Sequence, residues 1–193
     1  MTLRNLCSLL LIAVILIACG RSKDPEFYIL NPVPLQKSPV NKYQALQIGI
    51  DEISTPAYLE KPQLVIHNSA NRVQLNEYHQ WAEALDKNIK RVIQTNLSTL
   101  LPGAVVETSP WDIKFTPNYH LQLDISEFTI DIQGNSLLRG EYLIYYNEHI
   151  IKKQAVYYHL KVTDPTIDKL VSSMNANLTH LTRDIANTLK TVR

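Results

Sequence analysis

The chain has 193 residues, of which 19 are Lys or Arg and 18 are Asp or Glu. This balance argues against a nucleic-acid-binding protein, which usually carries a basic excess to neutralise phosphates. Hydrophobic residues make up 45% of the chain and charged residues 19%, which indicates a globular rather than a disordered protein. The two cysteines, Cys7 and Cys19, both lie near the N-terminus. We therefore expect neither a disulfide framework nor a cysteine-based zinc site in the folded part.

The N-terminus has the pattern of an export signal. Arg4 supplies one positive charge, and Leu6 to Ala18 form an uncharged apolar run of 13 residues. A membrane-spanning helix needs about 20 apolar residues, so this run is too short to span a bilayer and is typical of a signal peptide. The run ends in the letters LIAC at Cys19, which resembles the lipobox of bacterial lipoproteins.

The lipobox resemblance implies that residues 1–18 are a cleaved signal peptide and that Cys19 carries diacylglycerol, with a further acyl chain such as palmitate on its amino group. Two acyl chains are enough to hold a protein stably on a bilayer. Residues 19–26 would form a lipidated tether and residues 27–193 a single α+β domain. No Asp follows Cys19, which in enteric-type sorting favours the outer membrane. The alternatives are an ordinary secretory signal or a short N-terminal membrane anchor.

The first half of the chain predicts short strands followed by a helix. From Ala84 onward, apolar residues recur every three or four positions, which indicates an amphipathic helix. Pro102 and Gly103 are expected to end it. Before this helix, four segments have the composition of strands: Phe27–Leu30, Ala45–Ile53, Gln63–His67 and Arg72–Leu75.

The second half repeats this plan. Apolar and polar residues alternate over Tyr119–Ile132, but the phase slips by one residue at Ser126 and Glu127. A slip of this kind predicts a β-bulge, because otherwise half of the apolar side chains would face water. Leu137–Tyr146 and Ile150–Val162 predict a hairpin with one face toward the core.

The C-terminal segment predicts a second amphipathic helix. Asp164 can cap it, Pro165 can open it, and its apolar stripe runs from Ile167 to Leu189. We therefore expect an α+β fold, with an antiparallel or mixed sheet and two long amphipathic helices on one face. The two pseudo-repeated halves would cover residues 27–101 and 104–192.

Sequence signatures of catalysis are missing. The chain has no nucleophile elbow, P-loop, dinucleotide fingerprint or HExxH zinc motif, and its six histidines are isolated in the sequence. Asp124, Glu127 and Asp131 could form a carboxylate pair for acid–base catalysis, but acidic residues on the solvent side of a half-buried strand are the usual case. We expect no enzyme activity, no metal site and no cofactor.

Tyrosine is unusually common, with ten in the chain and five in the predicted hairpin. Exposed tyrosines are enriched where one protein surface meets another. The hairpin is therefore a candidate interface, through Tyr145, Tyr157 and the nearby His159. The alternative is that half-exposed tyrosines simply cover the sheet.

Four segments match a known pattern: FYIL at 27–30, IGIDEIS at 48–54, EYHQWAEALDKNI at 77–89 and LVSSMNANLTHLTRDIA at 170–186. Together with the lipobox they resemble the PqiC (YmbA) family, the auxiliary lipoproteins of ABC-type and MCE transport systems. Tyr78 and Trp81 resemble the start of the family's Tyr/Trp-Ala-Glu-Pro-Leu block, although Ala84 stands where that block commonly has Pro. We add Tyr78 and Trp81 to the candidate interface.

This resemblance implies an outer-membrane lipoprotein that faces the periplasm and assembles as a homo-oligomeric ring. The ring would receive the end of a tunnel-forming, PqiB-like MCE-domain protein that carries lipids between the membranes. The chain would then be a docking component and not an enzyme. Two alternatives remain open: a lipoprotein that assists an outer-membrane barrel, and a periplasmic hydrolase whose site is assembled from distant residues.

Overall fold

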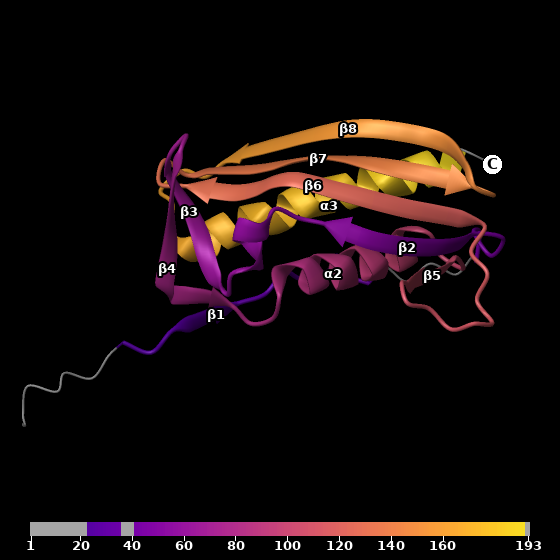
Figure 1. Cartoon of the computed structure of the whole chain (residues 1–193), viewed down its shortest axis with the longest axis horizontal. Coiled ribbons are helices and arrows are strands. Elements are labelled where there is room, and N and C mark those ends of the chain that lie inside the picture. Colours follow the sequence, from indigo (N-terminus) through magenta and orange to yellow (C-terminus); the bar gives the residue numbers. More distant parts are fainter. Residues whose placement is uncertain (1–22, 36–40, 192–193) are drawn as a thin grey trace, which may run out of the picture.

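The computed structural model describes residues 23–35 and 41–191, which form one mixed sheet of eight strands and two long helices (Figure 1). This confirms the expected α+β fold, and four strands followed by a helix occur twice in chain order. The helices are α2 (Leu85–Leu100) and α3 (Ile167–Thr191), and a short 3-10 turn covers Ala57–Glu60. The strands are β1 (Glu26–Tyr28), β2 (Gln47–Ser54), β3 (Gln63–Ser69), β4 (Arg72–Trp81), β5 (Val105–Thr108), β6 (Tyr119–Asp131), β7 (Asn135–Tyr146) and β8 (His149–Lys161).

Strand β6 organises the sheet. Along one edge it pairs antiparallel with β7, which in turn pairs with β8. Its other edge is shared by two parallel partners: β2 pairs near the start of β6, and β3 pairs at Ile130 and Asp131. Strand β2 leads on to β5, and β3 leads on to β4 and β1. Beyond β6 the sheet therefore divides into two arms, one of which ends at β1.

The predicted bulge in β6 is confirmed. Ile125 pairs with Gly140 and Glu127 pairs with Arg139, so Ser126 is the extra residue. Strands β6 and β7 approach closely here, because a Cβ on Gly140 would lie 2.4 Å from the carbonyl oxygen of Asp124. A side chain at this position would displace backbone, so glycine permits the bulge.

The predicted hairpin of β7 and β8 is also confirmed. Its turn consists of Asn147 and Glu148, whose φ angles are 45° and 68°. Positive φ at both central residues is the geometry of a type I′ turn, whose twist matches that of the flanking strands.

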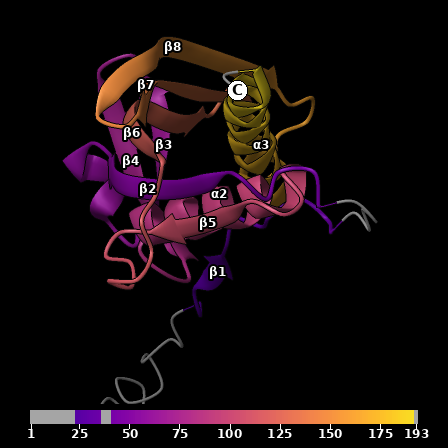
Figure 2. The same cartoon turned by 90° about the vertical axis from the view of Figure 1, so that its right-hand side faces the viewer.

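Both helices lie on the same side of the curved sheet (Figure 2). Helix α2 packs against β2 and β5, helix α3 packs against β7 and β8, and the two helices contact each other. The core lies between the helices and the sheet, with Phe128, Ile48, Ile89 and Leu178 among its fully buried side chains. Gly103, whose φ is 94°, follows the end of α2, as the sequence predicted.

The start of the C-terminal helix differs from the prediction. Helix α3 begins at Ile167, and the backbone N–H of Lys169 donates to the Thr166 hydroxyl at 3.4 Å. Thr166 therefore caps the helix. Asp164 instead has a φ of 55° and accepts a hydrogen bond from the Lys169 ammonium group. The prediction of Asp164 as the cap was wrong, because Pro165 lies ahead of the first helical turn instead of opening it.

Two strands differ from the sequence prediction as well. Strand β4 continues to Trp81, whereas the pattern indicated only Arg72–Leu75, and β5 was not predicted. Most side chains of β4 are exposed, and Val106 alone is buried in β5. Hydrophobic periodicity is the main sequence signal for strands, so strands that bury few side chains escape it.

Candidate functional site

The predicted signal peptide (1–18) and lipidation site (Cys19) lie outside the described residues. The structure describes the chain from Lys23 onward, and β1 begins at Glu26. None of the helices within the described ranges is long and apolar enough to cross a membrane.

Three predicted interface residues lie on the face of β7 and β8 that points away from α3, which we call the outer face. On β8, Tyr158 donates a hydrogen bond to a carboxylate of α3, so its neighbours Tyr157 and His159 project the other way. On β7, the hydroxyl of Tyr145 donates to the exposed Gln122 of β6 at 3.1 Å. The structure therefore brings Tyr145, Tyr157 and His159 onto one surface.

Tyr157 and His159 are both exposed on this face. Tyr157 is 59% exposed, and the Arg139 guanidinium lies 5.3 Å from the centre of its ring. His159 is fixed by Asn135, whose side-chain oxygen lies 3.1 Å from the His159 Nε2 atom. A rigid aromatic ring beside a guanidinium and an imidazole is typical of a protein interaction surface.

The outer face is hollowed on both sides of Tyr157. A cavity of about 540 Å³ lies over the bulge and is lined by Asp124, Ser126 and Gly140. A second, of about 440 Å³, is lined by Glu127. Tyr157 borders both. Both hollows are shallow and open, which suits contact with a macromolecule better than enclosure of a small ligand.

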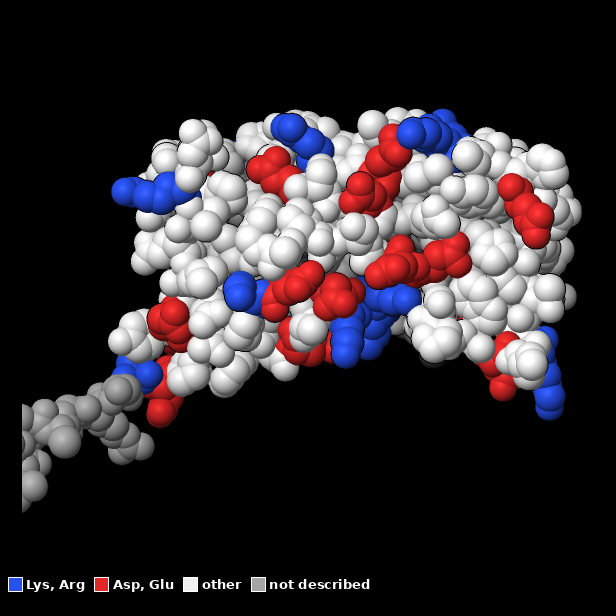
Figure 3. All heavy atoms as spheres, viewed as in Figure 1, with Lys and Arg blue, Asp and Glu red and all other residues white. Residues whose placement is uncertain are grey.

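Two of the three acidic residues considered for catalysis have structural partners. Asp131 accepts hydrogen bonds from the backbone N–H groups of Gln133 and Asn135, which holds the turn after β6. Glu127 lies 3.9 Å from the Arg139 guanidinium. Among the residues that the structure describes, no group of three or more His, Cys, Asp or Glu side chains could hold a metal ion. Basic and acidic side chains are interspersed on the side of the molecule shown in Figure 3.

The other two predicted interface residues lie on β4, in the other arm of the sheet. Tyr78 is exposed, but Trp81 is only 6% exposed and belongs to the hydrophobic core. The indole of Trp81 therefore offers little surface to a partner, and the proposed interface below does not include it.

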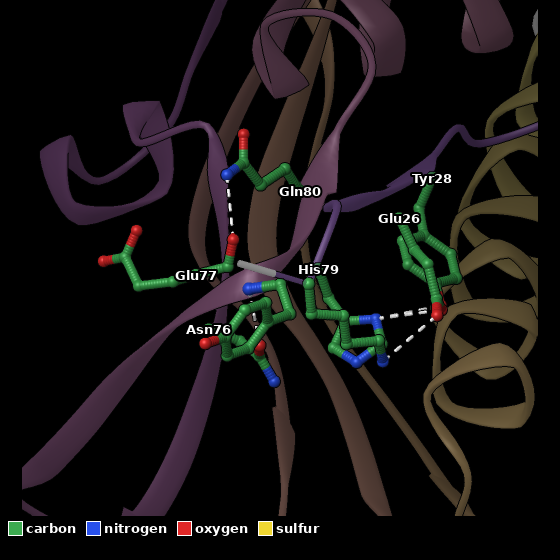
Figure 4. Close-up of polar contacts among 8 residues, drawn as sticks. Glu26, Tyr28, Asn76, Glu77, His79 and Gln80 are labelled. Carbon is green, nitrogen blue, oxygen red and sulfur yellow. Dashed lines mark hydrogen bonds and ion pairs between the residues drawn. The ribbon is translucent and has the colours of Figure 1, made fainter. Parts of the chain in front are cut away.

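Strands β1 and β4 meet in a polar cluster next to Trp81 (Figure 4). The Tyr28 hydroxyl donates to Glu26 at 3.0 Å, and His79 Nδ1 lies 3.1 Å from the same hydroxyl. Burial, reinforced by the bond to Glu26, raises the pKa of Tyr28 to about 12. The bond from Tyr28, together with Lys23, lowers the pKa of the Glu26 carboxyl. The cluster thus ties the short strand β1 to β4 by side chains as well as by backbone pairing.

The segment that follows β1 is held by side-chain amides of α2. The buried Asn88 accepts a hydrogen bond from the Leu30 N–H at 2.7 Å and donates to the Leu30 carbonyl at 3.1 Å. About two turns further along α2, the buried Asn96 accepts a hydrogen bond from the Val33 N–H at 2.7 Å. We call residues 29–35 the strap. Its backbone groups are paired by helix side chains in place of a neighbouring strand.

Helix α3 adds one bond to the strap, from the Asn31 N–H to the Asn175 side-chain oxygen at 2.8 Å. Sequence reasoning missed this arrangement. A signal was present, since Asn88 and Asn96 directly precede Ile89 and Leu97 of the apolar stripe and so border the buried side of the helix. Their partners lie about sixty residues away in the chain and could not be inferred from spacing.

Comparison with known proteins supports one family. Residues 28–186 match the sequence model of the ABC-type transport auxiliary lipoprotein component family. The chain is also 27% identical over 106 residues to the intermembrane transport lipoprotein PqiC of Escherichia coli K12 and to that of Shigella flexneri. These matches cover 55% of this chain and 55% of each relative, so the chain spans about half the length of the curated relatives it matches.

Two solved structures share the fold. The crystal structure of an uncharacterized protein superposes with a TM-score of 0.72 at 22% identity, covering 86% of this chain and 99% of that one. A protein from Xanthomonas campestris superposes with a TM-score of 0.70 at 11% identity, covering 83% of this chain and 92% of its own. At these identities the likeness concerns the fold alone.

Proposed function

Because the chain belongs to the family of ABC-type transport auxiliary lipoprotein components, we propose that it docks an MCE-domain transport protein at the outer membrane. In this proposal Cys19 carries the acyl chains, and the folded body faces the periplasm. The cargo of the system would be lipid in transit between the two membranes. The chain itself would catalyse no reaction.

The observation that carries the proposal is the family match over residues 28–186, which spans strands β2 to β8, all of α2 and most of α3. The names of the related proteins from Escherichia coli and Shigella flexneri include intermembrane transport. The outer face supports a docking role, because its exposed Tyr157 is bordered by open hollows instead of an enclosed pocket.

The proposed mechanism is positional. Several copies in a ring would hold many acyl chains, so each further anchor strengthens retention through effective concentration. The ring would fix the exit of the partner's tunnel against the bilayer, so that apolar cargo avoids water. Burying apolar cargo in this way removes the main free-energy barrier to its transfer, which is exposure of hydrocarbon to water.

We expect the double variant Tyr157→Ser, His159→Ser to weaken partner binding. A central aromatic anchor contributes roughly 2 kcal/mol or more, so the affinity for the MCE-domain protein should fall by about thirtyfold or more. The measurement is affinity purification of the lipidated protein from detergent-solubilised envelopes, with native mass spectrometry of the assembly. Because both side chains are exposed, the circular dichroism spectrum should not change.

Gln154→Ser is the matched control, since Gln154 is exposed on the opposite face of the same strand, beside Asp184 and Thr188 of α3. It should leave both partner capture and assembly unchanged. Full retention of the partner and the ring by the double variant would contradict the assignment of the outer face. Capture of an outer-membrane barrel, without any MCE-domain protein, would favour the barrel-assisting alternative instead.

A further inference from the structure

Large apolar side chains are exposed where the chain enters the fold. Phe27 is 62% exposed, Ile29 is 42% exposed and Tyr78 is 48% exposed. Backbone pairing places Phe27 near Tyr78, because Phe27 of β1 lies beside Gln80, two residues beyond Tyr78 on β4, and Ile29 directly follows β1. Alternation along β1 directs Phe27 away from the polar cluster of Glu26 and Tyr28. We call Phe27, Ile29 and Tyr78 the entry surface.

The entry surface lies close in sequence to the predicted lipid anchor. Only residues 20–26 separate Cys19 from Phe27. Even fully extended, this connection spans at most about 29 Å. The end of the body that carries β1 must therefore stay near the bilayer whenever Cys19 is acylated.

The root of this tether has a fixed position on the body. Strand β1 is paired with β4, and the strap behind it is bonded to the buried Asn88 and Asn96. The anchor is thus attached at one defined end of an elongated molecule. Figure 1 shows β1, β3 and β4 at this end, and the β7–β8 turn with the loop after β5 at the other.

The charges around the entry surface favour apolar contact over electrostatic attraction. The Lys23 ammonium lies 3.4 Å from the Glu26 carboxylate, and Asp24 lies between them in the chain. Within the described residues 23–28, one basic residue is therefore matched by two acidic ones, so this segment presents no excess of basic residues to anionic lipids. Tyrosine is enriched at the headgroup level of membranes, because one end of its ring is apolar and the other polar, and phenylalanine can enter the boundary between headgroups and acyl chains.

We propose that the entry surface rests against the phospholipid bilayer, with the side chains of Phe27, Ile29 and Tyr78 in its interfacial layer. This inference rests on the proposed acylation of Cys19 and goes beyond it. The acyl chains hold the protein on the membrane, and the entry surface sets its orientation. The opposite end of the body then points into the periplasm. The outer face is then oriented roughly perpendicular to the membrane plane, where a partner can reach it.

The test uses the lipidated, full-length protein with single cysteines introduced as Phe27→Cys, Tyr78→Cys and Ile113→Cys. In the mature lipoprotein the Cys19 thiol is occupied, so an environment-sensitive NBD dye labels only the introduced cysteine. Ile113 is the control, because it is 95% exposed in the loop after β5, at the opposite end. The labelled proteins are reconstituted into vesicles of phosphatidylethanolamine and phosphatidylglycerol, and some vesicles carry lipids with nitroxide on the acyl chain.

We expect NBD emission at positions 27 and 78 to shift to shorter wavelength and to be quenched by the nitroxide lipids, with little change on adding salt. The label at position 113 should be quenched by aqueous iodide instead. If the proteins float with the vesicles but the labels at positions 27 and 78 are quenched by iodide like the label at position 113, the entry surface does not contact lipid, whereas the anchor stands. If none of the proteins floats, both the anchor and this inference are wrong. A shift of the NBD emission at position 78 to shorter wavelength that requires the MCE-domain protein and occurs without lipid would overturn the inference in favour of a protein contact.

Discussion

Cys19→Ser should abolish acylation and remove the mature protein from the membrane fraction. The hydroxyl of Ser cannot take the place of the thiol that forms the thioether to diacylglycerol. Each buried methylene of an acyl chain contributes about 0.8 kcal/mol to membrane attachment, so loss of the chains leaves nothing of comparable strength. The measurement is incorporation of labelled palmitate together with fractionation of the cell envelope.

Cys7→Ser is the matched control for this prediction. Cys7 lies in the segment 1–18, which should be cleaved off, so its substitution should leave both labelling and fractionation unchanged. Palmitate incorporation by the Cys19→Ser variant would contradict the lipobox assignment. So would loss of incorporation in the Cys7→Ser variant, because it would locate the modified thiol within the apolar run.

Asn88→Ala should destabilise the fold more than substitution of any other amide that holds the strap. Asn88 satisfies both the N–H and the carbonyl of Leu30, and these hydrogen bonds are buried against α2. Removing it leaves two buried backbone groups unpaired, which lowers the free energy of unfolding by about 2–4 kcal/mol. Urea unfolding of the mature chain without its acyl groups measures this change.

Asn175→Ala is the control, because its hydrogen bond to the Asn31 N–H is exposed to water. Water can replace that bond, so the loss should stay within about 1 kcal/mol. Limited proteolysis should also cut the strap faster in the Asn88→Ala variant, since local opening exposes backbone to the protease. Equal losses of stability in the two variants would mean that the buried amide does not hold the strap.

The best-predicted parts of the fold are those with strong hydrophobic periodicity. The stripe from Leu85 to Leu97 predicted α2, and the phase slip at Ser126 predicted the bulge, because each is a local pattern of buried side chains. Strand β4 was underestimated because few of its side chains are buried. Strand β4 is positioned instead by its pairing with β1, which is distant in the sequence, and with β3, where the pairing register is irregular.

The candidate site was predictable only in part. Alternation along β8 correctly indicated that Tyr157 and His159 face away from the core. It could not show that Trp81 is buried, because that depends on how the end of β4 pairs with β1. The amides that hold the strap were missed for the same reason, since each joins residues far apart in the sequence.

The central claim is that an acylated N-terminus holds a docking body on the membrane. The most direct test is the intact mass and N-terminal sequence of the mature protein extracted from envelopes. We expect a polypeptide that begins at Cys19 and carries the added mass of diacylglycerol and an amide-linked acyl chain. A mature polypeptide that begins at another residue and has no acyl mass would contradict it.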